Sequence, residues 1–206
     1  MTAAGYADLA AKLPAGGDWM IADAIGITPI QETPWKMVQS KLHRWLEEPG
    51  KLKEGNPIAL AGLFEGLCQT GFAMQYMKDS RPASGAEHLY SHCWEMRDIQ
   101  KDGVQPSHGF KVAVGSLITT ALMEDVYFKM KSDEIATLAD KMPYLSANER
   151  DMQIGEFLGG TPFEKNARKV ALEKLPLGDA ARRRRRLIVE THPILAEKLR
   201  RQLLPF

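Results

Sequence analysis

The chain has 206 residues, of which 44% are hydrophobic and 26% are charged, so it is long enough to bury a core without disulfides or structural metals. Its formal net charge of +1 excludes a global field that would attract nucleic acid or an anionic membrane. It has no basic segment followed by an apolar one at its start, and no window approaches the roughly 20 apolar residues of a membrane-spanning helix. Its two cysteines, Cys68 and Cys93, have no metal-knuckle or redox spacing, which favours a reducing compartment. We therefore expect a soluble, cytoplasmic protein with neither a nucleic-acid nor a membrane partner.

Apolar residues recur every three or four positions along most of the chain, as at Trp35, Val38, Leu42 and Trp45, whereas strand-like alternation is hard to find. This pattern predicts an all-α fold, a helical bundle that forms one domain over residues 1–206. Two stretches, from about residue 58 to 77 and from about 110 to 130, are apolar nearly all round. That distribution is typical of helices buried in the middle of a bundle.

Helix starts are indicated at three places farther along the chain. Ser84 and Glu87 have the spacing of a capping box, which predicts a helix that begins near Ser84. The dipeptide before His108, Pro-Ser, predicts a second helix start, which places this histidine at the beginning of that helix. Ser146 and Glu149 repeat the capping box.

Three of the five histidines fall within two of these predicted helices. His88 and His92 are four residues apart and therefore share one helix face, while His108 lies at the start of the other helix. Two histidines and a carboxylate are a sufficient ligand set for a catalytic zinc-like ion, whose fourth position is left to substrate. The same spacing is also compatible with ordinary histidines on an amphipathic face and a hydrogen-bonding histidine at a helix end. Spacing alone leaves both interpretations open.

Three segments of the chain resemble motifs of the glycerol-1-phosphate dehydrogenases, the bacterial branch more than the others. They are AAGYADLAAK with GDWMIADAIG near the start, SRPASGAEHLYSH over residues 80–92, and SHGFKVAVG over residues 107–115. The resemblance implies that Asp8, His88 and His108 bind a divalent metal. It also implies that His92 contacts the substrate, where it serves as a catalytic residue, and that Asp8 contacts the substrate too. The fold it implies is that of the C-terminal helical domain of dehydroquinate synthase-like dehydrogenases.

By the same resemblance, the reaction is reduction of dihydroxyacetone phosphate with NAD(P), and the partner is a small phosphorylated polyol or ketone. The metal, zinc first with nickel or iron as alternatives, acts as a Lewis acid on the substrate oxygen. His92 would orient a substrate hydroxyl or relay its proton. Related histidine patterns occur in dehydroquinate synthases and iron-type alcohol dehydrogenases, so a related polyol or alcohol dehydrogenase, or a dehydroquinate synthase-like enzyme, is an alternative.

Residues for binding the nicotinamide cofactor are not recognisable in this sequence. No Gly-x-Gly-x-x-Gly occurs, and the Gly16-Gly17 and Gly159-Gly160 pairs follow no strand-like run. We therefore expect no NAD(P) site in this chain, no dehydrogenase activity from it alone, and either a missing N-terminal α/β domain or self-association as a partner. A stand-alone metal-binding protein with a non-enzymatic or regulatory role is the alternative.

Two surface features are also expected from the sequence. The five arginines of residues 182–186 would spread around a helix and do not interleave with aromatic residues, which argues against a nucleic-acid patch. An apolar patch is expected beside the metal site, because a surface that faces a second domain would be exposed in this chain.

Overall fold

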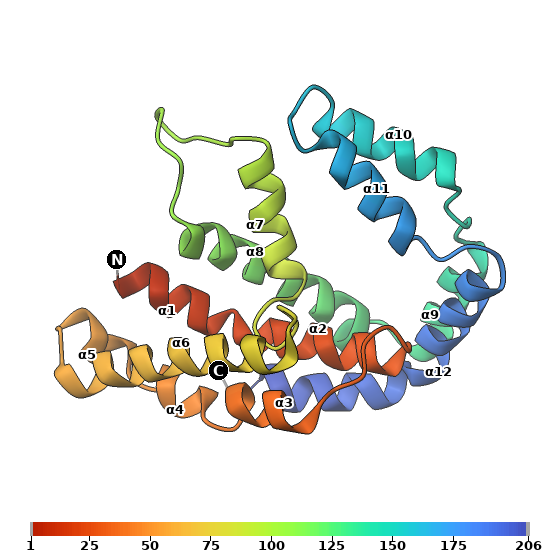
Figure 1. Cartoon of the computed structure of the whole chain (residues 1–206). Coiled ribbons are helices and arrows are strands. Elements are labelled where there is room, and N and C mark those ends of the chain that lie inside the picture. The colour runs from red at the N-terminus through yellow and green to blue at the C-terminus, as the bar shows by residue number, and fades with distance from the viewer. Residues whose placement is uncertain (1, 205–206) are drawn as a thin grey trace.

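A computed structural model describes residues 2–204 of the chain, and the regular structure in this range is helical (Figure 1). The helices are α1 (Thr2–Ala10), α2 (Lys12–Ala24), α3 (Glu32–Gln39), α4 (Leu42–Leu46), α5 (Pro49–Lys53), α6 (Pro57–Met77), α7 (Ala86–Met96), α8 (His108–Met123), the π-helix η1 (Glu124–Lys129), α9 (Ser132–Lys141), α10 (Ala147–Leu158), α11 (Glu164–Lys174) and α12 (Gly178–Leu203). The all-α prediction is confirmed over this range, where an isolated bridge between Lys101 and Val104 is the one β-type pairing. Within residues 2–204, no helix has the length and apolar character that crossing a membrane would require.

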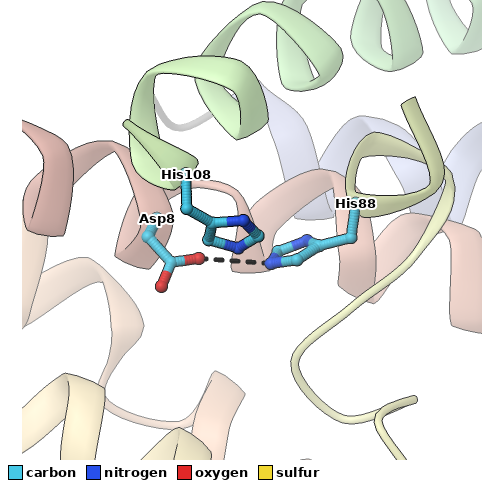
Figure 2. Close-up of side chains that lie close together, drawn as sticks. All are labelled: Asp8, His88 and His108. Atoms are coloured by element: carbon cyan, nitrogen blue, oxygen red, sulfur yellow. Dashed lines mark ion pairs between the residues drawn. The ribbon is translucent and has the colours of Figure 1, made fainter. Parts of the chain in front are cut away.

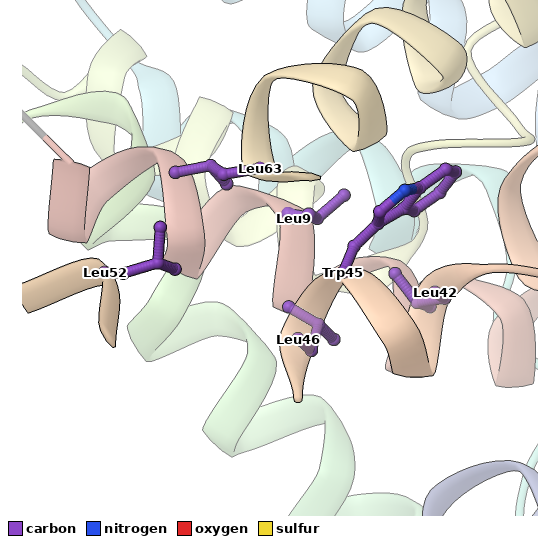
Figure 3. Packing of buried hydrophobic residues seen from close by; sticks show 6 residues of the cluster. All are labelled: Leu9, Leu42, Trp45, Leu46, Leu52 and Leu63. Atoms are coloured by element: carbon purple, nitrogen blue, oxygen red, sulfur yellow. The ribbon is translucent and has the colours of Figure 1, made fainter. Parts of the chain in front are cut away.

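One core cluster joins the first helix to α4, α5 and α6 (Figure 3). Its buried members are Leu9, Leu42, Trp45, Leu46, Leu52 and Leu63. Gly66 of α6 explains how these helices come so close, because a Cβ atom at this position would lie 2.7 Å from the Leu9 side chain and 3.0 Å from that of Trp45. The cluster therefore fixes α1, which carries Asp8, against the rest of the molecule.

A second core cluster lies where the long α12 packs along α2 and η1. Met123, Tyr127, Leu195 and Leu199 are its buried members. The imidazole of His192, also buried, stacks on the Tyr127 ring, with the ring centroids 5.4 Å apart, and its Nε2 lies 2.8 Å from the carbonyl oxygen of Val126. This cluster holds α12 beside α2, so that the start of α12 reaches the same side of the molecule as α7.

The two strongly apolar stretches do form helices, but they are not buried all round as predicted. Phe64 of α6 is 71% exposed and Leu117 of α8 is 72% exposed. The second stretch is also not one regular helix, because the α-helical part ends at Met123 and a π-helix follows. The prediction was wrong because neighbours cover only one side of each helix, and periodicity does not reveal how many sides are covered. Phe110 and Val114 belong to an exposed apolar row on α8, the helix that begins at His108.

Helices α10 and α11 form a hairpin that projects from the other helices (Figure 1). The predicted capping box at its start is confirmed, since Ser146 and Glu149 each accept a hydrogen bond from the backbone N–H of the other. Leu158 is the buried residue of α10, and α11 has none. Arg97, just after α7, contacts the hairpin by donating to the carbonyl oxygen of Phe157 at 2.6 Å. The hairpin is thus a lightly attached part of the fold.

Candidate metal centre

Helix α8 lies between α1 and α7, and two glycines of α8 make this close packing possible. A Cβ atom at Gly109 would lie 2.1 Å from the backbone oxygen of Ala4 in α1, and one at Gly115 would lie 2.3 Å from the backbone oxygen of Glu87 in α7. Any larger residue at either position would push two backbones apart. The segment SHGFKVAVG therefore supplies not only a histidine but also the space that lets three helices converge on it.

Asp8 of α1, His88 of α7 and His108 of α8 meet at this junction (Figure 2). Each offers one ligand atom, and the three atoms lie within 4.8 Å of one another. Oδ1 of Asp8 is 3.2 Å from Nε2 of His88. His88 is buried, whereas the side chain of His108 is 45% exposed, so the cluster is open on one side. The structure thus brings together the three residues that the resemblance proposes as ligands.

The start of α7 differs from the prediction in a way that matters for His88. The helix begins at Ala86 after Gly85, so Ser84 is not its N-cap and the predicted Ser84–Glu87 capping box is wrong. Glu87 is instead fully buried, and its Oε1 accepts hydrogen bonds from the Gly85 backbone N–H at 2.7 Å and from Nδ1 of His88 at 2.8 Å. Because Nδ1 of His88 is held by this carboxylate, Nε2 is the nitrogen that points to Asp8.

His108 has an equivalent support from Glu95 of α7. Its Nδ1 lies 3.1 Å from Oε1 of Glu95, which leaves Nε2 as the nitrogen available to an ion. The same Oε1 also accepts from the buried Lys111 ammonium at 3.1 Å, and Oε2 lies 3.1 Å from Nδ1 of His92. Burial raises the pKa of Glu95, but the hydrogen bonds from His108, His92 and Lys111 outweigh it and lower the pKa to about 2. Glu95 is therefore an ionised carboxylate that orients two imidazoles.

Asp8 is held ionised in a similar way. Burial raises its pKa, but hydrogen bonds from His88 and from the Lys12 ammonium, 2.9 Å away, lower it well below the usual range. For His88, burial lowers the pKa, and the hydrogen bonds to Asp8 and Glu87 raise it above the ordinary value. A proton on Nε2 of His88 would thus occupy the same position, between Nε2 and Asp8, as a divalent ion would.

The donor set fits a divalent metal of the zinc class. Two imidazole nitrogens and one carboxylate oxygen are ligands that zinc prefers, and three protein ligands leave one position open. Ligands at about 2.0–2.2 Å in tetrahedral geometry are roughly 3.4 Å apart, close to the separation of Asp8 and His88. The carboxylates behind both histidines have the outer-shell arrangement that fixes the orientation of metal-binding imidazoles. Asp8, His88 and His108 would hold such an ion.

His92 lies beside the three residues but is more open. Its imidazole centroid is 6.5 Å from that of His88 and 6.0 Å from that of His108, and its side chain is 54% exposed. His88 and His92 both line an open cleft of about 740 Å³ that runs from α7 to the linker between α11 and α12. His92 is therefore placed next to the cluster and on the cleft, where a bound molecule would reach it.

Four charged residues that support the site were not identified from the sequence as part of it. These are Lys12, Glu87, Glu95 and Lys111. The capping-box spacing indicates only a capping role for Glu87, whereas its position directly before His88 inside the motif is the signal that it supports this histidine. Glu95 lies seven residues after His88 and three after His92, which places it near the same helix face. The two lysines carry no such signal, because a buried lysine cannot be told from a surface lysine by its spacing.

The chain is similar to several proteins named glycerol-1-phosphate dehydrogenase [NAD(P)+]. One from Halalkalibacterium halodurans is 34% identical over 125 residues, which is 61% of this chain and 31% of the relative. Another from Geobacillus thermodenitrificans is 32% identical over 133 residues, 65% of this chain and 33% of the relative. One from Haloarcula marismortui is 33% identical over 122 residues, 59% of this chain and 34% of the relative.

The chain thus spans about a third of the length of the curated relatives it matches. No family model and no solved structure matches it. The resemblance that the three motifs indicate is confirmed, since bacterial and archaeal relatives carry that name.

Proposed function

We propose that this chain supplies the metal- and substrate-binding part of a glycerol-1-phosphate dehydrogenase. The observation that supports this most is the convergence of Asp8, His88 and His108 from three separate helices, with ligand atoms within 4.8 Å of one another. The relatives supply the second support, because their name gives the reaction and the cofactor. We propose NAD(P) as the hydride carrier and a small phosphorylated ketone or polyol as the substrate, in the cytoplasm.

In this proposal a divalent ion, zinc first and nickel or iron as alternatives, acts as a Lewis acid toward the carbonyl or hydroxyl oxygen of the substrate. Asp8 and the two histidines hold it, and the negative charge of Asp8 offsets part of the charge of the ion. The side chain of Asp8 is 28% exposed, and we propose that it contacts the substrate too. Glu87 and Glu95 keep the Nε2 atoms of His88 and His108 aimed at one point, so little reorganisation is needed on binding.

His92 is proposed to contact the substrate and to act as a catalytic residue. Its Nδ1 is held by Oε2 of Glu95 at 3.1 Å, which directs Nε2 away from that carboxylate. From its place on the cleft it can donate a hydrogen bond to a substrate hydroxyl or move a proton at that oxygen. Because it is exposed, it can exchange that proton with solvent.

Zinc titration of the purified protein tests the metal site. We expect one zinc ion per chain to remain after gel filtration of the wild-type protein, and none in Asp8→Asn or His108→Ala. The matched controls are Asp140→Asn and His43→Ala, which alter exposed residues outside the site and should keep the ion. Stoichiometric zinc in either ligand variant, measured by elemental analysis, would refute the assignment.

Substrate binding separates the proposed enzyme function from a purely metal-binding role. We expect the zinc-loaded chain to bind glycerol 1-phosphate in calorimetry, and His92→Ala to weaken this binding while it leaves the zinc content unchanged. Zinc binding without any glycerol 1-phosphate binding would favour the non-enzymatic alternative. NAD(P)H-dependent reduction of dihydroxyacetone phosphate by the chain alone would contradict the expectation that it needs a further cofactor-binding partner.

A further inference from the structure

The cleft beside the metal centre has two walls of different chemistry. One wall is α7, with His88 and His92, and the segment that precedes it, with Arg81. The other wall consists of the end of α11, the linker at residues 175–177 and the beginning of α12, with Lys174 and Arg184. Of the three proposed ligands, His88 lines this cleft, so a molecule in the cleft has His88 and His92 on one side and the α11–α12 wall on the other.

Most charges of the cleft are already neutralised within the protein. The Arg81 guanidinium forms an ion pair with Asp18, and the Arg81 backbone N–H donates to Asp79 at 2.9 Å. Glu173 pairs with Lys169 at 3.9 Å. The ion-paired groups therefore offer little net charge to a ligand, whereas Asp79 keeps the negative charge of its carboxylate.

Lys174 and Arg184 are different, because neither forms an ion pair or a side-chain hydrogen bond with any of residues 2–204. Arg184 is half-buried in the wall, whereas Lys174 is exposed at its edge. Two other arginines of residues 182–186 do have partners: Arg182 pairs with Asp179, and Arg185 lies over the Tyr144 ring, 3.6 Å from its centroid. A half-buried guanidinium without a partner loses hydration that nothing in the described chain replaces.

We infer that Arg184, assisted by Lys174, binds the anionic group of the substrate, a phosphate monoester, on the side of the cleft opposite His88 and His92. A guanidinium matches two phosphate oxygens with parallel N–H donors, and such charge-assisted pairs are stronger than neutral hydrogen bonds. This inference rests on the proposed function, since it assigns the far end of the same substrate. It makes the α11–α12 wall a determinant of specificity for phosphorylated over unphosphorylated polyols.

The test is calorimetry on the full chain in sulfate-free buffer. It compares the binding of glycerol 1-phosphate with that of glycerol, and it also measures the binding of inorganic phosphate. We expect Arg184→Gln to weaken glycerol 1-phosphate binding by about tenfold or more, and Lys174→Gln by about threefold because that lysine is exposed. Arg186→Gln is the matched control, since this exposed arginine of the same helix does not line the cleft and should change nothing. Zinc content should be the same in all three variants.

A second measurement locates the bound phosphate. With cobalt in place of zinc, the ³¹P relaxation of glycerol 1-phosphate should be enhanced in the wild-type protein, and the enhancement should weaken in Arg184→Gln together with binding. Wild-type affinity in the Arg184→Gln/Lys174→Gln double variant, or no binding of glycerol 1-phosphate to the wild-type chain, would overturn the inference. Phosphate binding that depends on Arg184 in a chain that takes up no metal would support this subsite while it contradicts the proposed metal function.

Discussion

The helix junction that holds Asp8, His88 and His108 differs from the α10–α11 hairpin in how deeply its charged side chains are buried. At the junction, Lys12, Glu87 and Lys111 are 2%, 0% and 8% exposed, and each is paired with an oppositely charged or hydrogen-bonding group. In the hairpin, Arg168 forms ion pairs with Asp151 and Glu164 at the surface. Both regions are rich in ion pairs, but only the junction contains charged side chains that are almost completely buried.

Burial of a charged group costs free energy unless the group is paired. A region that contains several buried charged groups is therefore a candidate functional site. At the junction the buried charges converge on the two imidazoles and the Asp8 carboxylate. In the hairpin the charges only support two helices that bury few apolar residues. The difference predicts that perturbations of the junction change both stability and metal binding, whereas equivalent perturbations of the hairpin change little.

The largest expected effect comes from adding one methyl group at Gly109. Because a Cβ atom there would lie 2.1 Å from the Ala4 backbone oxygen, Gly109→Ala must move α1 away from α8. We expect a loss of about 3 kcal/mol in the free energy of unfolding and a loss of zinc binding, since Asp8 moves with α1. Urea denaturation and zinc titration measure the two effects.

The matched change in the hairpin is Gly155→Ala. Its Cβ atom would meet the end of the Arg168 side chain, which can shift, so we expect an effect within about 1 kcal/mol of zero. Equal losses of stability from the two substitutions would show that the junction is no more tightly packed than the hairpin.

The next largest effect is expected at Glu87. Glu87→Gln keeps an oxygen that can accept from the Gly85 N–H but removes the negative charge beside Nδ1 of His88. Loss of such an outer-shell carboxylate weakens metal binding by about 10–100-fold. Zinc competition with a chromophoric chelator measures the affinity, and Glu124→Gln, at an exposed ion pair in η1, is the control. Unchanged affinity in Glu87→Gln would mean that this carboxylate serves only the fold.

Much of the ligand set could be predicted from the sequence, but its surroundings could not. His88 and His108 were identified from spacing, helix-start signals and motif resemblance, and Asp8 from resemblance alone. The helix-start signals at Ser107 and Ser146 were correct, but the capping box at Ser84 was wrong, because Glu87 turned inward to His88 instead of capping. Which faces of α6 and α8 are covered depends on contacts between distant segments, and local patterns do not report them.

The smallest expected effect is the acid sensitivity that Glu95 gives the junction in metal-free protein. Its pKa is about 2 in the folded chain, below the roughly 4.3 of an unfolded glutamate. A lowered pKa contributes stability that is present above pH 4.3 and lost as the pH falls toward 2. Glu95→Gln should therefore lower the free energy of unfolding at pH 6 by on the order of 1 kcal/mol, and this difference should shrink toward zero near pH 2.5.

Glu164 of the hairpin is the matched control for this acid effect. Its pKa is also lowered, by hydrogen bonds from the Gly160 N–H and from Arg168, and its side chain is 29% exposed, close to the 32% of Glu95. Because Glu164 stabilises only the lightly attached hairpin, Glu164→Gln should leave the pH dependence of global stability nearly unchanged. Urea denaturation in EDTA at pH 6, 4 and 2.5 measures how the free energy of unfolding of each variant depends on pH. If Glu164→Gln flattened the acid transition as much as Glu95→Gln, hairpin and junction carboxylates would contribute alike, and the contrast between the two regions would fail.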